Sequence, residues 1–168
     1  MRRNAGLAIA AVVAVAALVG MIVIVVGTRG SSDARVPFGE ATAAAAPFAG
    51  FGAARLSVGG RCLRVLVAAT AAQRARGLRD VQSLAPYDGM LFVNRGDTDT
   101  RFTMAKTRLP LDITWYEAGG EPVGHAQMAP CPAGSDATCP TYASPRRYRY
   151  ALERHAGATG GGTLSACA

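Results

Sequence analysis

A run of twenty uncharged residues near the N-terminus, from Leu7 to Val26, restricts the fold of this chain more than any other feature. A helix over this run would be about 30 Å long, which matches the hydrocarbon thickness of a bilayer. Arg2 and Arg3 precede the run, so the positive-inside rule predicts a cytoplasmic N-terminus and an extracytoplasmic remainder. We therefore expect residues 1–27 to hold a single transmembrane helix that acts as a signal anchor in the cell membrane.

A cleaved signal peptide is the alternative interpretation of the same run. Signal peptides usually have an apolar core of about 7–15 residues, which is shorter than this one. Small-x-small sequences suited to cleavage occur at Ala41–Ala43 and Ala44–Ala46, well beyond the end of the run. Cleavage would release a secreted domain, so both interpretations place the rest of the chain outside the cytoplasm.

Residues 28–54 have the composition of a flexible tether. They contain Gly-Ser-Ser, an alanine run and two prolines, and they sustain neither a helical nor a strand period. Phe38, Phe48 and Phe51 are unusual in such a linker. Two roles are open for these rings, namely contact with the membrane surface and docking on the domain.

Residues 55–168 carry the turn and strand signals of a mainly β domain. Two apolar stretches flank a Gly-Gly pair and predict a hairpin. Thr70 and Gln73 form a capping box that opens one short helix, and Gly77 ends it. Many short strands separated by turns predict a compact β-sandwich or barrel with one short helix. The further strands are expected at Met90–Val93, Arg101–Ala105, Leu111–Tyr116, Val123–His125 and Arg147–Leu152.

Six ordered motifs in this domain resemble those of a known family. They are Gln73–Leu78, Asp88–Phe92, Phe102–Met104, Leu109–Ile113, Pro130–Cys131 with Cys139–Tyr142 and Ser144–Pro145, and Tyr150–Glu153. This part of the chain, about residues 56–153, is similar to the domain of unknown function 192 family (DUF192). The resemblance implies a compact β-rich fold that is often exported or membrane-anchored, and it implies no established activity. The chain departs from the family pattern at Thr103, where a tryptophan is common, and in its glycine-rich C-terminus.

Four cysteines in an exported domain suggest two disulfides. Cys131 and Cys139 enclose a short loop, and a bridge between them would contribute about 2–3 kcal/mol in the chain-entropy description. Cys62 and Cys167 then remain, and a bond between them would staple the C-terminal tail to an early strand. Zinc sites favour closer cysteine spacings, so no metal is expected.

A small polar pocket is predicted from five side chains with hydrogen-bonding or charged groups. They are Arg76, Thr107, Asp112, Tyr142 and Ser144. Two roles are open for Asp112, which alternates with apolar neighbours: a ligand-binding or basic carboxylate, and a structural hydrogen-bond acceptor. Arg76 either holds an anionic ligand or pairs with a carboxylate. Thr107 lies in a loop near Asp112, and the hydroxyls of Thr141, Tyr142 and Ser144 follow the Cys131–Cys139 loop, where they would line a pocket. Turn hydrogen bonding explains Ser144 equally well.

These features favour a membrane-anchored binding or accessory module of the cell envelope, whose partner is a small ligand or a protein. The alternatives are a hydrolase that uses Asp112 and a purely structural envelope protein. The sequence contains neither a nucleophile motif nor a phosphate loop or dinucleotide fingerprint, so no catalytic residue and no cofactor is expected.

The net charge of +7 has two interpretations, namely a solvated surface of mixed charge and a preference for anionic partners such as the headgroups of the lipid bilayer or acidic polymers. The basic and aromatic run Arg146–Tyr150 superficially suits nucleic acid. An exported location and the strand alternation favour another interpretation of this run, in which the tyrosines belong to the core and the arginines are solvated. No nucleic-acid partner is therefore expected.

Overall fold

The computed structural model describes residues 39–158 and 161–168. The apolar run, Phe38 and the first part of the predicted tether lie outside the described residues. Within the described part of the chain, no helix has the length and hydropathy needed to cross a membrane.

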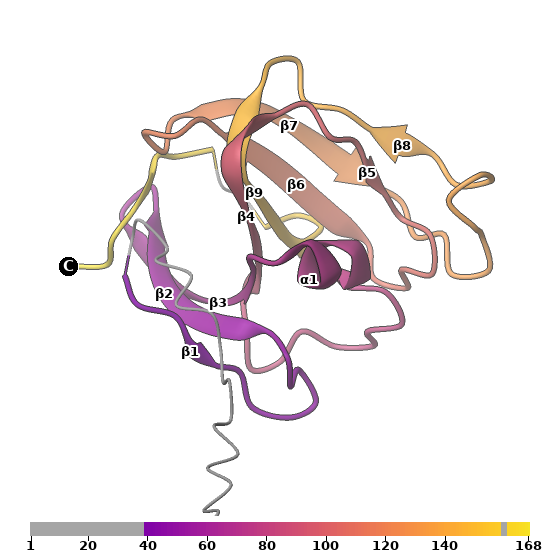
Figure 1. Cartoon of the computed structure of the whole chain (residues 1–168), viewed down its shortest axis with the longest axis horizontal. Helices are drawn as coiled ribbons and strands as arrows, with labels where there is room; N and C mark the ends of the chain where they lie inside the picture. Colours follow the sequence, from indigo (N-terminus) through magenta and orange to yellow (C-terminus); the bar gives the residue numbers. More distant parts are fainter. Residues whose placement is uncertain (1–38, 159–160) are drawn as a thin grey trace, which may run out of the picture. The chain divides into compact units, whose positions relative to one another are not determined.

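The described chain is mainly β, with one short helix in the part the structure covers (Figure 1). The large sheet has the order β1-β2-β3-β4-β9-β6-β7, and β10 also pairs with β2, at the end of that strand away from β1. A separate two-stranded sheet joins β5 to β8. The elements are β1 Thr42–Ala43, β2 Gly52–Val58, β3 Arg61–Ala68, α1 Ala71–Arg76, β4 Gly89–Thr98, β5 Phe102–Thr103, β6 Leu111–Tyr116, β7 Pro122–Met128, β8 Thr141–Tyr142, β9 Tyr148–His155 and β10 Leu164–Ser165.

The local turn and capping signals of the sequence are confirmed. β2 and β3 form the expected hairpin around Gly59 and Gly60, both of which adopt positive φ angles that glycine tolerates. The Thr70 side chain accepts the backbone N–H of Gln73, and the Gln73 side chain accepts that of Thr70. The helix ends at Gly77, whose N–H donates to the Gln73 carbonyl. α1 thus connects β3 to β4, which are parallel.

The strand order of the described residues is that of an open sheet, so the prediction of a barrel is wrong. A closed barrel would need hydrogen bonds between β7, at one end of the strand order, and the strands beside β2 at the other end. The C-terminal tail supplies only β10, whose two residues pair with Ser57 and Val58 of β2. The glycine-rich segment before it is a poor strand former. The sheet curves instead, and Figure 1 shows α1 in the hollow between the β2–β3 and β6–β7 ends.

Both faces of the central strands are buried. The hollow face carries one apolar cluster, which includes Leu66, Met90, Ile113 and Trp115. The opposite face carries a second cluster around Leu56 and residues of β6 and β9. β9 lies between β4 and β6, so a side chain on its hollow face is surrounded by strands on both sides.

Part of the predicted tether belongs to the folded domain. Phe48 and Phe51 are 2% and 3% exposed, and both join the cluster on the hollow face. Residues 42–43 pair with β2 as β1. The reason is that burial of two phenylalanine rings gives several kcal/mol, on the order of 2–3 for each ring, which offsets the entropy of ordering a short linker. For these two rings, docking on the domain is the observed role.

Both predicted disulfides, Cys131–Cys139 and Cys62–Cys167, are formed. The second bond holds the C-terminal tail on β3, as expected. The tail also packs on the β6–β7 turn, where the Leu164 N–H donates to the Gly120 carbonyl. Gly120 has a φ of +91°, and a Cβ there would collide with the Leu164 carbonyl, so glycine is required at this crossing.

Candidate functional site

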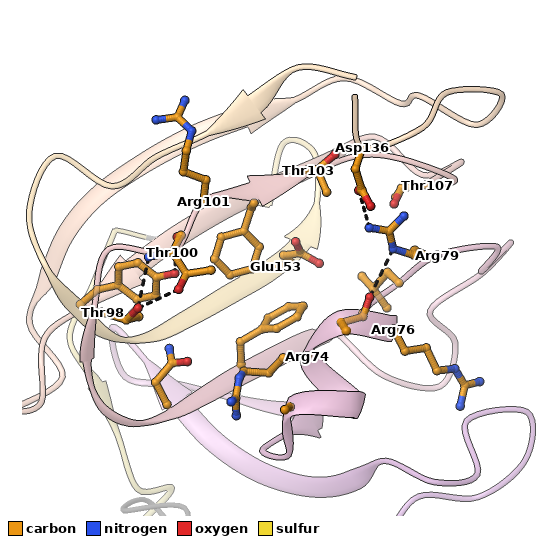
Figure 2. A pocket seen from close by; sticks show the side chains of 18 of the residues that line it. Arg74, Arg76, Arg79, Thr98, Thr100, Arg101, Thr103, Thr107, Asp136 and Glu153 are labelled. Atoms are coloured by element: carbon orange, nitrogen blue, oxygen red, sulfur yellow. Dashed lines mark hydrogen bonds and ion pairs between the residues drawn. The ribbon is translucent and has the colours of Figure 1, made fainter. Parts of the chain in front are cut away.

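A cavity of about 650 Å³ opens between the C-terminal end of α1, the distal half of β4 and the strand β5 (Figure 2). The fold positions these three walls. The parallel β3–β4 crossover sets α1 over the hollow face, and β9 forms the floor beneath it. The lining combines apolar, hydroxyl and charged groups. Its main members are Arg74, Phe92, Phe102, Thr103, Tyr148 and Glu153.

Glu153 lies on the floor of this cavity. Its backbone pairs with Met90 on one side and with Ile113 on the other, and both neighbours belong to the apolar cluster of the hollow face. The residue is 5% exposed. Figure 2 shows its carboxyl among the lining side chains, with Arg79 and Asp136 at one side and Thr98 and Thr100 at the other.

No hydrogen bond or ion pair holds the Glu153 carboxyl among the described residues. Desolvation by burial raises its pKa from 4.5 to about 8. The group is therefore protonated at neutral pH, and a protonated carboxyl both donates and accepts hydrogen bonds. Its unused hydrogen-bonding capacity is directed into the cavity.

Aromatic rings form the wall next to Glu153. The rings of Phe92 and Phe102 meet edge to face at 5.0 Å and 90° between their planes. Phe102 also contacts Tyr148, whose hydroxyl donates to the Thr100 carbonyl over 2.6 Å. Desolvation raises the pKa of Tyr148, so its hydroxyl stays neutral. The wall is accordingly apolar and rigid.

Several arginines border the cavity, and hydrogen bonds or an ion pair hold most of their guanidinium groups in place. Arg74 donates to the carbonyls of Ala69 and Val93. Arg79 donates to two carbonyls and pairs with Asp136 at 2.6 Å.

Arg101 donates to Thr141 and, in Figure 2, reaches outward. Arg95 is exposed at the mouth. The border is therefore strongly basic.

Two of the five predicted site residues line this cavity, Arg76 and Thr107. The Arg76 guanidinium lies over the Phe51 ring at 4.7 Å and donates to the Ala49 carbonyl, so it braces the N-terminal segment. The Thr107 hydroxyl is buried and donates to the Ala105 carbonyl.

The other three predicted residues lie elsewhere. Asp112 occupies the opposite face of β6 from Ile113, is 7% exposed, and accepts the Gly157 N–H at 2.8 Å. The structure thus keeps Asp112 apart from the cavity. The Tyr142 hydroxyl accepts the Ala129 N–H, and the Ser144 hydroxyl accepts the Arg146 N–H in a turn.

Sequence reasoning did not find Glu153. One signal was present in the sequence, because the apolar run Tyr150-Ala151-Leu152 is followed directly by Glu153. An acid within a strand that is buried on both faces is unusual, since acids are rarely buried without a partner. The alternation of Tyr148, Tyr150 and Leu152 with two arginines predicts a strand, but it does not indicate that Glu153 is buried.

The fold and motifs define a β domain with one helix over a curved sheet. The chain belongs to the DUF192 family, described as Uncharacterized ACR, whose family model matches residues 54–164.

Two solved structures share the fold. A protein of unknown function from Novosphingobium aromaticivorans matches with a TM-score of 0.62 and 21% identity, over 74% of this chain and 91% of that one. A candidate transcription regulator from Sinorhizobium meliloti matches with a TM-score of 0.55 and 26% identity, over 66% of this chain and 89% of that one. No curated protein matches the chain.

Proposed function

We propose that this domain is a binding module of the cell envelope and that it takes a small organic ligand into the cavity between α1, β4 and β5. The observation that carries the proposal is the Glu153 carboxyl, which is buried, lacks a partner among the described residues and is directed into the cavity. A carboxyl in such a place gains about 0.5–1.5 kcal/mol from a typical hydrogen bond. A ligand that satisfies this group would recover that free energy.

The shape and chemistry of the cavity support the same proposal. Its volume of about 650 Å³ lies within the range of about 300–1,000 Å³ that is usual for small-molecule sites. Aromatic rings with a few convergent polar groups are the usual lining of such sites. The edge-to-face packing of Phe92 and Phe102 preorganises the wall, which lowers the entropy lost on binding.

The location is a separate part of the proposal, in which residues 1–27 anchor the chain and residues after them work outside the cytoplasm. Its support is the uncharged run Leu7–Val26, preceded by two arginines, and the two disulfides, which persist in oxidising compartments. Protease added to sealed membrane vesicles should degrade the domain only when the extracytoplasmic side faces outward. Degradation in vesicles of the opposite orientation alone would refute this placement.

The binding proposal is tested with a matched pair of helix variants in the full chain, purified in an uncharged detergent. Ala75 lines the cavity and is exposed, so Ala75→Trp places an indole in the cavity. Ala72 is exposed on the same helix and lies outside the lining, so Ala72→Trp is the control.

A thermal-shift screen of small organic acids, amides and amines should find compounds that stabilise the wild type and Ala72→Trp. The same compounds should lose their effect on Ala75→Trp. Equal shifts in both variants would show that binding occurs elsewhere, and would overturn the proposal.

A further inference from the structure

The charges around the cavity point to the class of ligand. The side chains that line it include five arginines, on three different segments, and one aspartate besides Glu153. They are Arg74, Arg76, Arg79, Arg95, Arg101 and Asp136. Asp136 is held by Arg79 in an ion pair. The remaining arginines have no acidic counterpart in the lining, so the potential in the cavity favours an anion over a cation.

The uncharged groups of the cavity wall and of Glu153 on its floor limit the ligand further, besides its charge. Phe92 and Phe102 offer apolar surface, and the Tyr148 hydroxyl already donates to the Thr100 carbonyl. Glu153 is the acid that faces the cavity interior, and its carboxyl has no partner in the described part of the chain. Because burial keeps the carboxyl protonated at neutral pH, it presents an O–H donor.

We infer that the cavity binds a small organic anion, a carboxylate or similar oxyanion attached to an apolar or aromatic body, and that Glu153 donates a hydrogen bond to that oxyanion. This inference rests on the proposed function and names its ligand class. A hydrogen bond from a neutral acid to an oxyanion is short and about twice as strong as a neutral pair. The apolar body would pack against the rings of Phe92 and Phe102.

A cation bound by ionised Glu153 is the opposing arrangement. Aromatic rings beside a carboxylate suit an ammonium group. The arginines at the border would repel such a ligand, and burial disfavours the ionised form of Glu153. The variant Glu153→Gln distinguishes the two arrangements, because it keeps a neutral hydrogen-bond donor and removes the carboxylate. It should therefore retain an anionic ligand and lose a cationic one.

The test uses three probes of nearly equal shape and different charge, namely benzoate, benzamide and benzamidinium. Binding is followed by ¹H–¹⁵N correlation spectra of the full chain in an uncharged detergent, at the amides of Gly77 and Gly96, which line the cavity. At about pH 6.5, benzoate should bind about tenfold more tightly than the other two probes, because of its charge-assisted hydrogen bond and the arginine field.

The pH dependence identifies the donor. With a pKa of about 8, about one tenth of the Glu153 side chains are protonated at about pH 9, so benzoate affinity should fall about tenfold from pH 6.5. Glu153→Gln should keep benzoate affinity within about threefold and lose this fall. Glu117→Gln, which changes an exposed acid outside the cavity, should behave as the wild type.

The outcomes separate the two proposals. Preference for benzamidinium, abolished by Glu153→Gln, would overturn the anion inference and leave the cavity as a binding site. Benzoate affinity that stays unchanged at pH 9 would overturn the role of Glu153 and leave the cavity as a binding site. Benzoate binding that persists unchanged in Ala75→Trp would overturn the proposed cavity function itself. The absence of any shift at Gly77 and Gly96 with all three probes would overturn the inference together with the proposed cavity function.

Discussion

Replacement of Glu153 by glutamine should make the stability of this protein much less dependent on pH. The reason is that the native protein holds the Glu153 carboxyl protonated, whereas the unfolded chain ionises it near its ordinary pKa of 4.5. Glutamine has nearly the same shape and stays neutral. The variant therefore removes one titration and leaves the rest of the molecule unchanged.

The sign and magnitude follow from the pKa values of the two states. The folded pKa, about 8, is raised above the unfolded value of 4.5. The stabilising contribution of the protonated group is thus fully present below pH 4.5 and is lost as pH rises through 8. Each pH unit in this window removes about 1.4 kcal/mol, so about 3.5 kcal/mol of the free energy of unfolding is lost between pH 5 and pH 8.

The assay is urea unfolding of the full chain, followed by fluorescence. Trp115 is the single tryptophan and is 1% exposed, so its emission reports loss of the core. The difference in unfolding free energy between Glu153→Gln and the wild type should grow by about 3.5 kcal/mol from pH 5 to pH 8. Glu117→Gln, at an exposed position, should give a constant difference. Growth of less than about 1 kcal/mol for Glu153→Gln would show that the carboxyl is hydrated or paired, and would refute the reasoning.

Four further changes test other parts of the structure. Replacing both Cys62 and Cys167 by serine should lower the unfolding free energy by up to about 5 kcal/mol in chemical denaturation, because that bond closes a loop of 105 residues; no change would mean that the bond is absent. Phe48→Ala should lower it by about 3–5 kcal/mol, whereas a ring in a free tether would give nothing. Asp112→Ala should lower it by about 1–2 kcal/mol through the unpaired Gly157 N–H and leave probe binding intact, and lost binding would link that face to the cavity. Arg95→Gln should weaken benzoate binding about two- to fivefold at low salt and less at high salt. An unchanged affinity would show that the charge of Arg95 does not contribute to the attraction of the anion.

The parts of the fold that could be predicted are those set by neighbours in sequence. The Thr70–Gln73 capping box needs three residues of context and formed as expected. The Gly59-Gly60 turn needs only two positive φ angles. The Cys131–Cys139 bond closes a short loop, so its pairing follows from proximity along the chain.

The parts that could not be predicted depend on which face of the sheet each strand buries. Alternation in β6 separates Asp112 from Ile113, but it does not say which of the two faces α1 covers. Phe48 and Phe51 lie in a segment without periodicity, so only the tertiary structure shows that they pack on the hollow face. Closure of the sheet depends on whether the C-terminal tail pairs with strands at both ends of the sheet, and only the tertiary structure shows that, among the described residues, β10 pairs with β2 alone.

Two buried acids on opposite faces of the sheet illustrate how a structural carboxylate differs from one available to a ligand. Asp112 receives a backbone N–H at 2.8 Å, so the fold uses one of its oxygens. Glu153 has apolar neighbours on β4 and β6 and receives no partner within the described residues, so the fold gains nothing from its charge and loses stability when it ionises. A leucine at that position would pack against the same neighbours without the desolvation of a carboxyl. Residues that lower stability without a structural partner are characteristic of functional sites, because function and stability place different demands on them. The same reasoning requires the two acids to respond oppositely to neutralisation, with a gain of stability near neutral pH for Glu153→Gln and a loss for Asp112→Ala.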